Sequence, residues 1–257
     1  MAWSKFPYPD DSYVYTPAGL KKAWARLHAG DAEPFPKDAK LVDAWIAFHA
    51  GEFEKAAKLG LAAGVDGYSV ANKATAIYAN YLEKSEKKKL AMFQEVAERC
   101  EAQQKEQPKN AAAWYWHAYS LGRYAQGISI VKALSQGIGN KVKNSLDMTV
   151  KLAPKHADAH IGLGTYHAEI IDKVGAMIGG LTYGAKKEEG LKFFKTALKL
   201  NPDSAIARVE YANGLVMLEG KKKMDEAVKL YEEAAACEPV DAMERLDVEL
   251  AKEELDD

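Results

Sequence analysis

The sequence predicts an all-α protein built as an array of repeated helix pairs, and three observations lead to this prediction. Prolines recur at matching places, each after a helix-like stretch: Pro108, Pro154, Pro202 and Pro239. Apolar residues recur at intervals of three and four, which is the spacing of one face of an α-helix. No segment shows the alternating apolar and polar pattern of a half-buried β-strand.

The first part of the chain, residues 1–37, predicts an N-terminal arm followed by one helix. Residues 1–15 hold tyrosines and prolines with little periodicity, so we expect an arm that clamps the body of the protein. Thr16 and Pro17 supply an N-cap and a first-turn proline for a helix that runs to about His28. Residues 31–36 are a linker.

Residues 38–239 predict the repeat array. Leu41, Ala44, Trp45 and Phe48 lie at helical spacing, and the glycine at position 51 separates them from a partner helix that begins near Phe53. Two further helices are expected over about 69–82 and 86–107. Residues 240–257 predict a final amphipathic helix, which we interpret as the polar cap that a repeat array needs over its last apolar face.

The last three pairs carry a recognisable pattern. Their first helices read Trp114-x₂-His117-Ala118-x₂-Leu121, His160-x₂-Leu163-Gly164-x₂-His167 and Arg208-x₂-Tyr211-Ala212-x₂-Leu215. Their second helices read Val142-x₃-Leu146-x₇-Pro154, Gly190-x₃-Phe194-x₂-Ala197-x₄-Pro202 and Ala227-x₃-Tyr231-x₂-Ala234-x₄-Pro239. We expect Trp114, Gly164 and Phe194 to belong to the core.

This pattern resembles the tetratricopeptide repeat (TPR) superfamily, whose unit of 34 residues reads W-x₂-L-G-x₂-Y, then A-x₃-F, then P. The resemblance covers about 200 residues, from 38 to 239. It implies a right-handed superhelix of about five antiparallel helix pairs with a C-terminal capping helix. The chain is also similar, more distantly, to two groups of TPR relatives with elongated repeats. These are the T component of TRAP-type transporters and the regulator-of-microtubule-dynamics proteins.

The proline gaps of 46, 48 and 37 residues exceed the unit of 34 by 12, 14 and 3 residues. The excess locates two apolar, glycine-rich inserts, roughly Gly122–Lys141 and Ala168–Glu189, in which Ala133-Leu134-Ser135-x-Gly137 matches Gly180-Leu181-Thr182-x-Gly184. If both helices of a pair share the excess, each grows by about 10 Å. The inserts have three readings: extra internal core, a surface for homo-oligomerisation, or the lining of an apolar ligand pocket near Tyr124, Met177 and Tyr183.

One face of the first helices lies beside the core face and, by the resemblance, lines the inner groove. The candidate partner-binding residues on it are Tyr115, Tyr119, Arg123, Ile161, Thr165, Glu169, Asn213 and Met217. Val209 has the same phase and is another groove position. Arg123 and Glu169 occupy equivalent places in adjacent repeats, so we expect them to form an ion pair, because an unpaired charge in apolar surroundings is costly.

Several classes of function are disfavoured by the sequence. A net charge of −2 and a pI of about 6.3 argue against nucleic-acid binding by phosphate neutralisation. The apolar runs are too short for membrane insertion. His156, His160 and His167 share one helix but occupy core positions, so we interpret them as packed, hydrogen-bonded histidines and expect no metal site. No cofactor motif or paired nucleophile and base is present.

We therefore expect a non-enzymatic interaction or scaffold module that binds a protein or peptide partner in its concave groove. The alternative is a TPR protein that binds a small apolar or anionic ligand at the inserts, as a transport accessory. The N-terminus carries no apolar signal segment, which predicts a cytoplasmic location, or a periplasmic one if a signal peptide has been removed.

Overall fold

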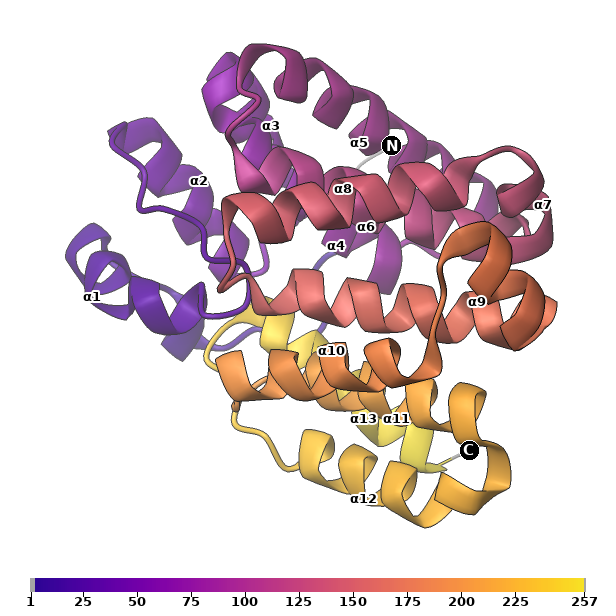
Figure 1. Cartoon of the computed structure of the whole chain (residues 1–257). Helices are drawn as coiled ribbons and strands as arrows, with labels where there is room; N and C mark the ends of the chain where they lie inside the picture. The colour runs from indigo at the N-terminus through magenta and orange to yellow at the C-terminus, as the bar shows by residue number, and fades with distance from the viewer. Residues whose placement is uncertain (1–2, 257) are drawn as a thin grey trace.

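The computed structural model describes residues 3–256, and every regular element in that range is helical (Figure 1). Short 3-10 helices cover Asp11–Tyr13, Gly64–Gly67 and Gly220–Lys223. The α-helices are α1 (Pro17–Leu27), α2 (Ala39–His49), α3 (Phe53–Ala62), α4 (Tyr68–Tyr81), α5 (Glu86–Glu106), α6 (Ala111–Ile128), α7 (Ile130–Ser135), α8 (Ile138–Leu152), α9 (Ala157–Tyr183), α10 (Lys187–Leu200), α11 (Ala205–Glu219), α12 (Met224–Ala235) and α13 (Ala242–Asp256).

Five helix pairs follow one another along the chain, so the predicted all-α repeat array is confirmed. The pairs are α2 with α3, α4 with α5, α6 with α8, α9 with α10, and α11 with α12. Each second helix also packs against the first helix of the next pair, and the first helices form an inner layer in which α2 contacts α4, α4 contacts α6, α6 contacts α9, and α9 contacts α11. The boundaries expected for α1, α4 and α5 agree with the structure to within one residue.

A proline and a helix cap recur together where a new pair begins. Asn110, His156 and Ser204 each lie two residues after a proline, and each accepts a hydrogen bond from a backbone N–H in the first turn of α6, α9 or α11. The proline ends the preceding helix, and the cap satisfies one of the free N–H groups of the next. The repeat period is therefore encoded by local stop and start signals.

Small residues let the helices of the last pairs approach closely. A Cβ on Gly164 would lie 2.7 Å from the ring of Phe194, and one on Gly214 would lie 2.3 Å from it. The Phe194 ring is fully buried between these glycines and stacks on Tyr211 at 5.4 Å. Gly164 and Phe194 thus belong to the core, as expected.

Trp114 was expected in the core but is only partly buried, and its indole Nε1 donates to the carbonyl of Pro108 at 3.0 Å. The buried indole of this helix belongs to Trp116, whose exposed fraction is 2%. The three histidines of α9 are buried and hydrogen-bonded, as predicted: His156 to Ala159, His160 to Pro154 and His167 to Lys186.

The two inserts share one design. Each has a break with positive φ, Ser129 (φ 89°) or Gly175 (φ 81°), then a short helical segment, then a left-handed glycine, Gly137 (φ 74°) or Gly184 (φ 66°). The extra residues are therefore not shared equally by the two helices of a pair, contrary to one expectation. The breaks make the chain turn, so the extra length forms a separate tip instead of two longer helices.

Part of each insert packs inward and part faces solvent. Leu134 joins Tyr166, Ile170 and Ala185 in a buried cluster that connects the two inserts. Among the large apolar side chains at the tips, Val131, Met177, Ile178 and Leu181 are between 55% and 85% exposed. The inserts thus contribute to the core and also present an apolar tip surface, which we define as these four side chains.

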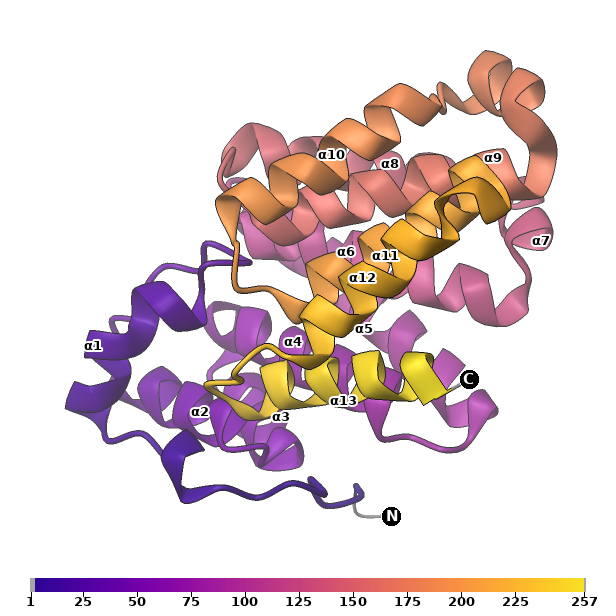
Figure 2. The same ribbon diagram turned by 90° about the horizontal axis from the view of Figure 1, so that it is seen from below.

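The last helix, α13, lies over α11 and α12 as a cap would, but it also crosses the inside of the array and contacts α2 (Figure 2). One group of its buried side chains, including Val248 and Ala251, packs with α11 and α12. Another, Ala242 and Leu246, belongs to the core of the first repeats. The inner helices therefore form a closed ring, α2–α4–α6–α9–α11–α13, whereas an open array would leave the groove accessible.

Candidate functional site: an inner pocket closed by the last helix

A pocket with a volume of about 150 Å³ lies inside the ring of helices. Its walls come from α4, α6, α7, α8, α9, α11 and α13. Most of its lining is apolar or aromatic, and the first insert contributes Ile130, Ala133, Leu134 and Ile138. Because helices from α4 to α13 surround it on several sides, this is the best-formed candidate site in the described part of the protein.

Six of the eight groove residues named from the sequence come together around this pocket: Tyr115, Tyr119, Arg123, Ile161, Thr165 and Glu169. Asn213 does not line it, and its side-chain oxygen accepts a hydrogen bond from Tyr231 at 2.5 Å. Met217 lies one turn further along α11 and does not line it either. The shared helical phase therefore located most of this site.

The residues named for a pocket at the inserts lie elsewhere. Tyr124, Met177 and Tyr183 are absent from the lining of the inner pocket. Met177 is 77% exposed on the apolar tip surface, and the carbonyl of Tyr183 accepts a hydrogen bond from the Tyr166 hydroxyl at 3.1 Å. Most of the insert residues that line the pocket come from the inward-facing side of the first insert, and the second insert contributes Glu169 and Ile170.

Arg123 pairs with Glu210 and not with Glu169, so the predicted ion pair is wrong in its partner. Arg123 Nη2 lies 2.7 Å from Glu210 Oε1, and Thr165 donates to the other oxygen of that carboxylate at 3.0 Å. Gln126 instead connects Arg123 with Glu169, at 3.0 Å and 2.7 Å. Glu210 lies on α11, the first helix of the following pair. The equivalent positions on α6 and α9 did not indicate that this residue faces inward.

Three carboxylates of the lining have raised pKa values. Burial raises the pKa of Asp158 to about 7, and the charges of Asp31 and Glu244 add to this while Lys73 opposes it. Burial also raises the pKa of Glu169, although the hydrogen bond from Gln126 opposes the shift. The pKa of Asp247 is well above its usual range because the group is buried, despite a hydrogen bond from Tyr81.

Aromatic side chains form another wall. Tyr115, Trp116 and Tyr119 from α6 contact one another, with ring centroids 4.9 to 6.2 Å apart. Tyr81 from α4 donates its hydroxyl hydrogen to Asp247 Oδ1 at 2.5 Å, which joins this wall to α13. Arg123 lies over the Tyr119 ring at 5.4 Å.

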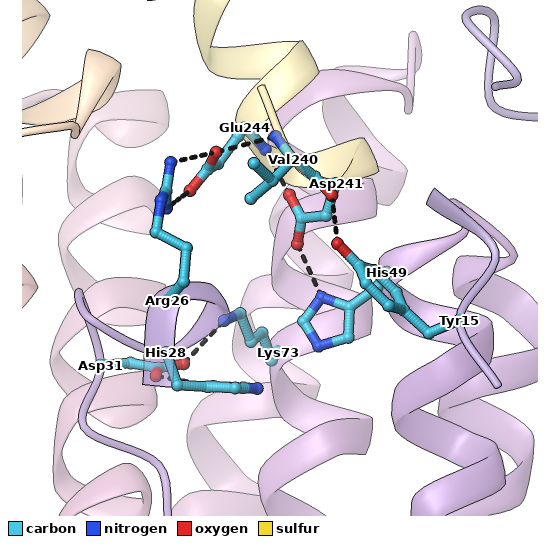
Figure 3. A network of polar contacts seen from close by, with 9 residues as sticks. All are labelled: Tyr15, Arg26, His28, Asp31, His49, Lys73, Val240, Asp241 and Glu244. Carbon is cyan, nitrogen blue, oxygen red and sulfur yellow. Dashed lines mark hydrogen bonds and ion pairs between the residues drawn. The ribbon is translucent and has the colours of Figure 1, made fainter. Parts of the chain in front are cut away.

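A buried polar network holds α13 in place and so keeps the pocket closed (Figure 3). His49 Nδ1 and Asp241 Oδ2 are 2.7 Å apart, and Tyr15 donates to the carbonyl of Val240 at 2.8 Å. Arg26 binds both oxygens of Glu244, at 2.5 and 3.1 Å. The N-terminal arm packs on the body at several places, among them the start of the last helix, where Tyr15 binds, while Arg26 belongs to α1.

Near the contacts that hold α13 lies a second polar group (Figure 3). In it, Lys73 Nζ lies 2.6 Å from Asp31 Oδ2, and His28 Nδ1 lies 2.8 Å from Asp31 Oδ1. Burial lowers the pKa of His28 to about 4, against the opposing effect of Asp31. The His28 imidazole is therefore mostly neutral at neutral pH. The buried charges here are those of Lys73 and Asp31, which balance each other.

Sequence reasoning missed several polar residues of the site, among them Tyr81, Asp158, Glu210 and Asp247. Asp247 reaches the pocket only because α13 folds back, and no local pattern signals that contact. Asp158 lies in the first turn of α9, where an acid is ordinarily explained by the helix dipole. Its place within the ring is a property of the assembled helices.

Between residues 3 and 256 there is no cluster of three or more His, Cys, Asp or Glu side chains arranged to hold a metal ion. In the same range, no helix combines the length and apolar character that crossing a membrane requires.

The fold is shared with solved TPR structures. The chain is similar to TTC0263, a thermophilic TPR protein of Thermus thermophilus, with a TM-score of 0.57 and 16% identity over 83% of this chain and 97% of that chain. It also aligns with MamA MSR-1 C2 at 13% identity, covering 84% of this chain and 95% of that chain, but the TM-score of 0.43 is too low to support a conclusion. No curated protein matches the chain.

At the level of families, the model for regulator of microtubule dynamics protein 1-3 matches residues 68–257, from the start of α4 to the end of the chain. This span includes every helix that lines the inner pocket. The helical-repeat fold is one typical of protein-interaction scaffolds, and the chain belongs to the regulator of microtubule dynamics protein 1-3 family.

Proposed function

We propose that this protein is a non-catalytic binding module whose ligand is a small, largely apolar molecule held in the inner pocket. The observation that carries the proposal is the position of α13, which crosses the groove in which an extended peptide would lie. What remains accessible is a compact apolar and aromatic pocket with a few polar groups, which is the usual character of a small-molecule site.

The size and charge of the pocket narrow this proposal. About 150 Å³ is comparable to a cavity that holds a six-carbon ring. Arg123 is already neutralised by Glu210 at 2.7 Å, so the pocket offers no free cation for an anionic ligand. Of the two ligand classes considered from the sequence, a small anionic ligand is therefore disfavoured and a small apolar ligand is retained.

Gly122 offers a direct test. It lies in α6, lines the pocket, and a Cβ placed on it would meet no atom within 4 Å. Gly122→Leu should fill the pocket and weaken binding of a neutral probe, 2-phenylethanol, at least tenfold. Gly122→Ala is the matched control: it removes the same helical glycine, adds only a methyl group, and should keep most of the binding.

Binding would be measured by saturation-transfer NMR and isothermal titration calorimetry with the full chain. Both variants should be at least as stable as the unmodified protein, since replacing glycine within a helix gains up to about 1 kcal/mol. If 2-phenylethanol binds Gly122→Leu as tightly as it binds the unmodified protein, the pocket is not the binding site.

The apolar tip surface favours a second candidate, self-association. Leu181 is 85% exposed and Met177 is 77% exposed, whereas soluble monomers seldom display several large apolar side chains together. Both belong to the second insert, on the segment that follows the break at Gly175. This candidate uses a different surface from the pocket, so the two functions can be tested separately.

A further inference from the structure

The pocket contains more negative than positive side chains. Its lining includes four carboxylates, Asp158, Glu169, Glu210 and Asp247, and the single cation of Arg123. Arg123 is paired with Glu210. Within residues 3–256 the other three carboxylates have no ion-pair partner, and Glu169 and Asp247 receive hydrogen bonds only from the neutral groups of Gln126 and Tyr81. Arg123 is therefore the one cation of the described lining and is balanced by Glu210, while Lys73 acts on Asp158 from outside the lining.

Two polar groups of the lining are also unused. The Tyr115 side chain is only 7% exposed, and its hydroxyl has no hydrogen-bond partner among the described residues. The carboxylate of Asp158 likewise accepts no hydrogen bond from any described residue. Both groups line the same pocket, and the charge of Asp158 adds to burial, the larger cause, in raising the pKa of Tyr115. The Tyr115 side chain is buried and that of Asp158 is partly exposed, so their oxygens are available to a ligand or water in the pocket.

The helix dipole favours the charge of Asp158, in the first turn of α9, but the carboxylate does not cap the helix. Its position in the first turn of α9 would suit a cap, but the N–H of Ala159 is already bound by the side chain of His156 at 3.1 Å. The Asp158 carboxylate instead lies against the backbone at position 30, where a Cβ would come within 2.6 Å of Asp158 Oδ1. Glycine at position 30 leaves room for the carboxylate in its present orientation, and the carboxylate lies there without capping the helix.

From these observations we infer that the ligand of the inner pocket is an organic ammonium ion, with its charged group beside Asp158 and Tyr115 and its apolar part toward the first insert. This inference rests on the proposed function and specifies its ligand class. An ammonium group provides three hydrogen-bond donors. Asp158 and the Tyr115 oxygen are matching acceptors, and the Tyr81 ring in the lining is of the kind that attracts a cation.

The size of the pocket limits the apolar part. A volume of about 150 Å³ accommodates one six-membered ring or a chain of similar bulk, by comparison with a cavity that holds benzene. A suitable probe is therefore 2-phenylethylammonium. Its neutral and anionic counterparts of nearly the same shape are 2-phenylethanol and 3-phenylpropionate.

The first experiment compares these three probes by titration calorimetry at pH 8 with the full chain. The ammonium probe should bind at least tenfold more tightly than the alcohol, and the carboxylate should bind most weakly. Equal affinity for ammonium and alcohol, or a preference for the carboxylate, would overturn the inference while leaving the proposed function intact. Absence of binding by all three probes would instead refute the proposed function, and the inference with it.

The second experiment uses Asp158→Asn, which keeps the size of the side chain and removes its charge. The ammonium probe should lose its advantage and bind about as weakly as the alcohol, whose own affinity should change little. Asp172→Asn, on the same helix but outside the pocket, is the matched control and should keep the full preference. Retained preference in Asp158→Asn would show that Asp158 does not recognise the ligand.

Proton release provides an independent readout. Because burial raises the pKa of Asp158 to about 7, an ammonium ligand that selects the carboxylate should displace a proton at pH 6. Calorimetry in buffers of different ionisation enthalpy should show this release for the ammonium probe and not for the alcohol. Affinity for the ammonium probe should also rise between pH 6 and pH 8. A merely structural role of Asp158 predicts neither effect.

Discussion

His49 Nδ1 and Asp241 Oδ2 lie 2.7 Å apart, although 192 residues separate them along the chain, and both side chains are buried. Asp241 has two roles, because its other oxygen accepts the N–H of Glu244 at 2.8 Å and so caps α13. Burial would raise the pKa of Asp241, but the hydrogen bonds from His49 and Glu244 hold it below its usual range. One carboxylate therefore both starts the last helix and fastens it to the first repeat.

Asp241→Ala is expected to lower the free energy of unfolding by about 3 kcal/mol. Loss of a helix cap costs about 1 kcal/mol, and leaving a buried partner without its acceptor costs about 1–3 kcal/mol more. Asp38→Ala is the matched control, since Asp38 caps α2 through Lys40 at an exposed site and should cost only about 1 kcal/mol. Urea titrations would measure both, and equal losses would show that the contact with His49 adds nothing to the cap.

Stability should depend on pH through two opposing effects. The pKa of Asp158 is about 7 in the folded protein, above its unfolded value, so this group disfavours folding increasingly as pH rises from about 4 to 7. Burial lowers the pKa values of His28 and His156 to about 4, below their unfolded values. These histidines disfavour folding as pH falls from about 6.5 to 4, because the unfolded chain then binds protons that the folded chain does not.

Asp158→Asn should separate these effects. The variant should be more stable than the unmodified protein by up to about 4 kcal/mol at pH 8, because the pKa is raised by about three units and each unit corresponds to about 1.4 kcal/mol. The difference should become small at pH 4, where the folded carboxyl is protonated and the unfolded one is about half protonated. Urea unfolding between pH 4 and 8 measures this, with Asp172→Asn as the control. A constant difference across that range would mean that the charge of Asp158 is not the cause.

Ser129 has φ 89° and ψ 126°, a conformation that is ordinary for glycine and strained for other residues. Its side chain is exposed, and no hydrogen bond of the hydroxyl accounts for the conformation within residues 3–256. Ser129→Gly should therefore raise the free energy of unfolding by about 1 kcal/mol. Ser135→Gly, within the helical turn of α7, should instead lower it by about 0.5 kcal/mol. Urea titrations should therefore show changes of opposite sign in the free energy of unfolding for the two variants. Destabilisation by both would contradict the proposed backbone strain at Ser129.

Leu181→Lys tests self-association through the apolar tip surface. The unmodified protein is expected to form dimers at high concentration in sedimentation velocity experiments, and the variant should stay monomeric because a charge replaces the most exposed large apolar side chain. Its free energy of unfolding should change by less than about 0.5 kcal/mol. The control is Leu61→Lys, at a 42% exposed site on α3, which should leave dimer formation unchanged. A protein that is monomeric without either substitution would rule out this use of the surface.

Much of the site followed from helical phase. Tyr115, Tyr119 and Arg123 share a face of α6, and a helix of known phase places its i and i+4 side chains together whatever surrounds it. The pairing of Arg123 was wrong because phase says nothing of which charge lies opposite. Glu210 lies across the ring on α11. The distance between Arg123 and Glu210 depends on how tightly the array of helices curves.

The sequence by itself determined the local elements: the helices, their caps two residues after each proline, and the two inserts that interrupt the period. These features depend on neighbours within one or two turns, so the chain encodes them directly. Only the tertiary structure decided that α13 closes the ring and that Asp158, Asp247 and Tyr81 meet in one pocket. The contacts that close the ring join residues as far as 225 positions apart, and they form because α13 has apolar side chains to bury on two sides at once.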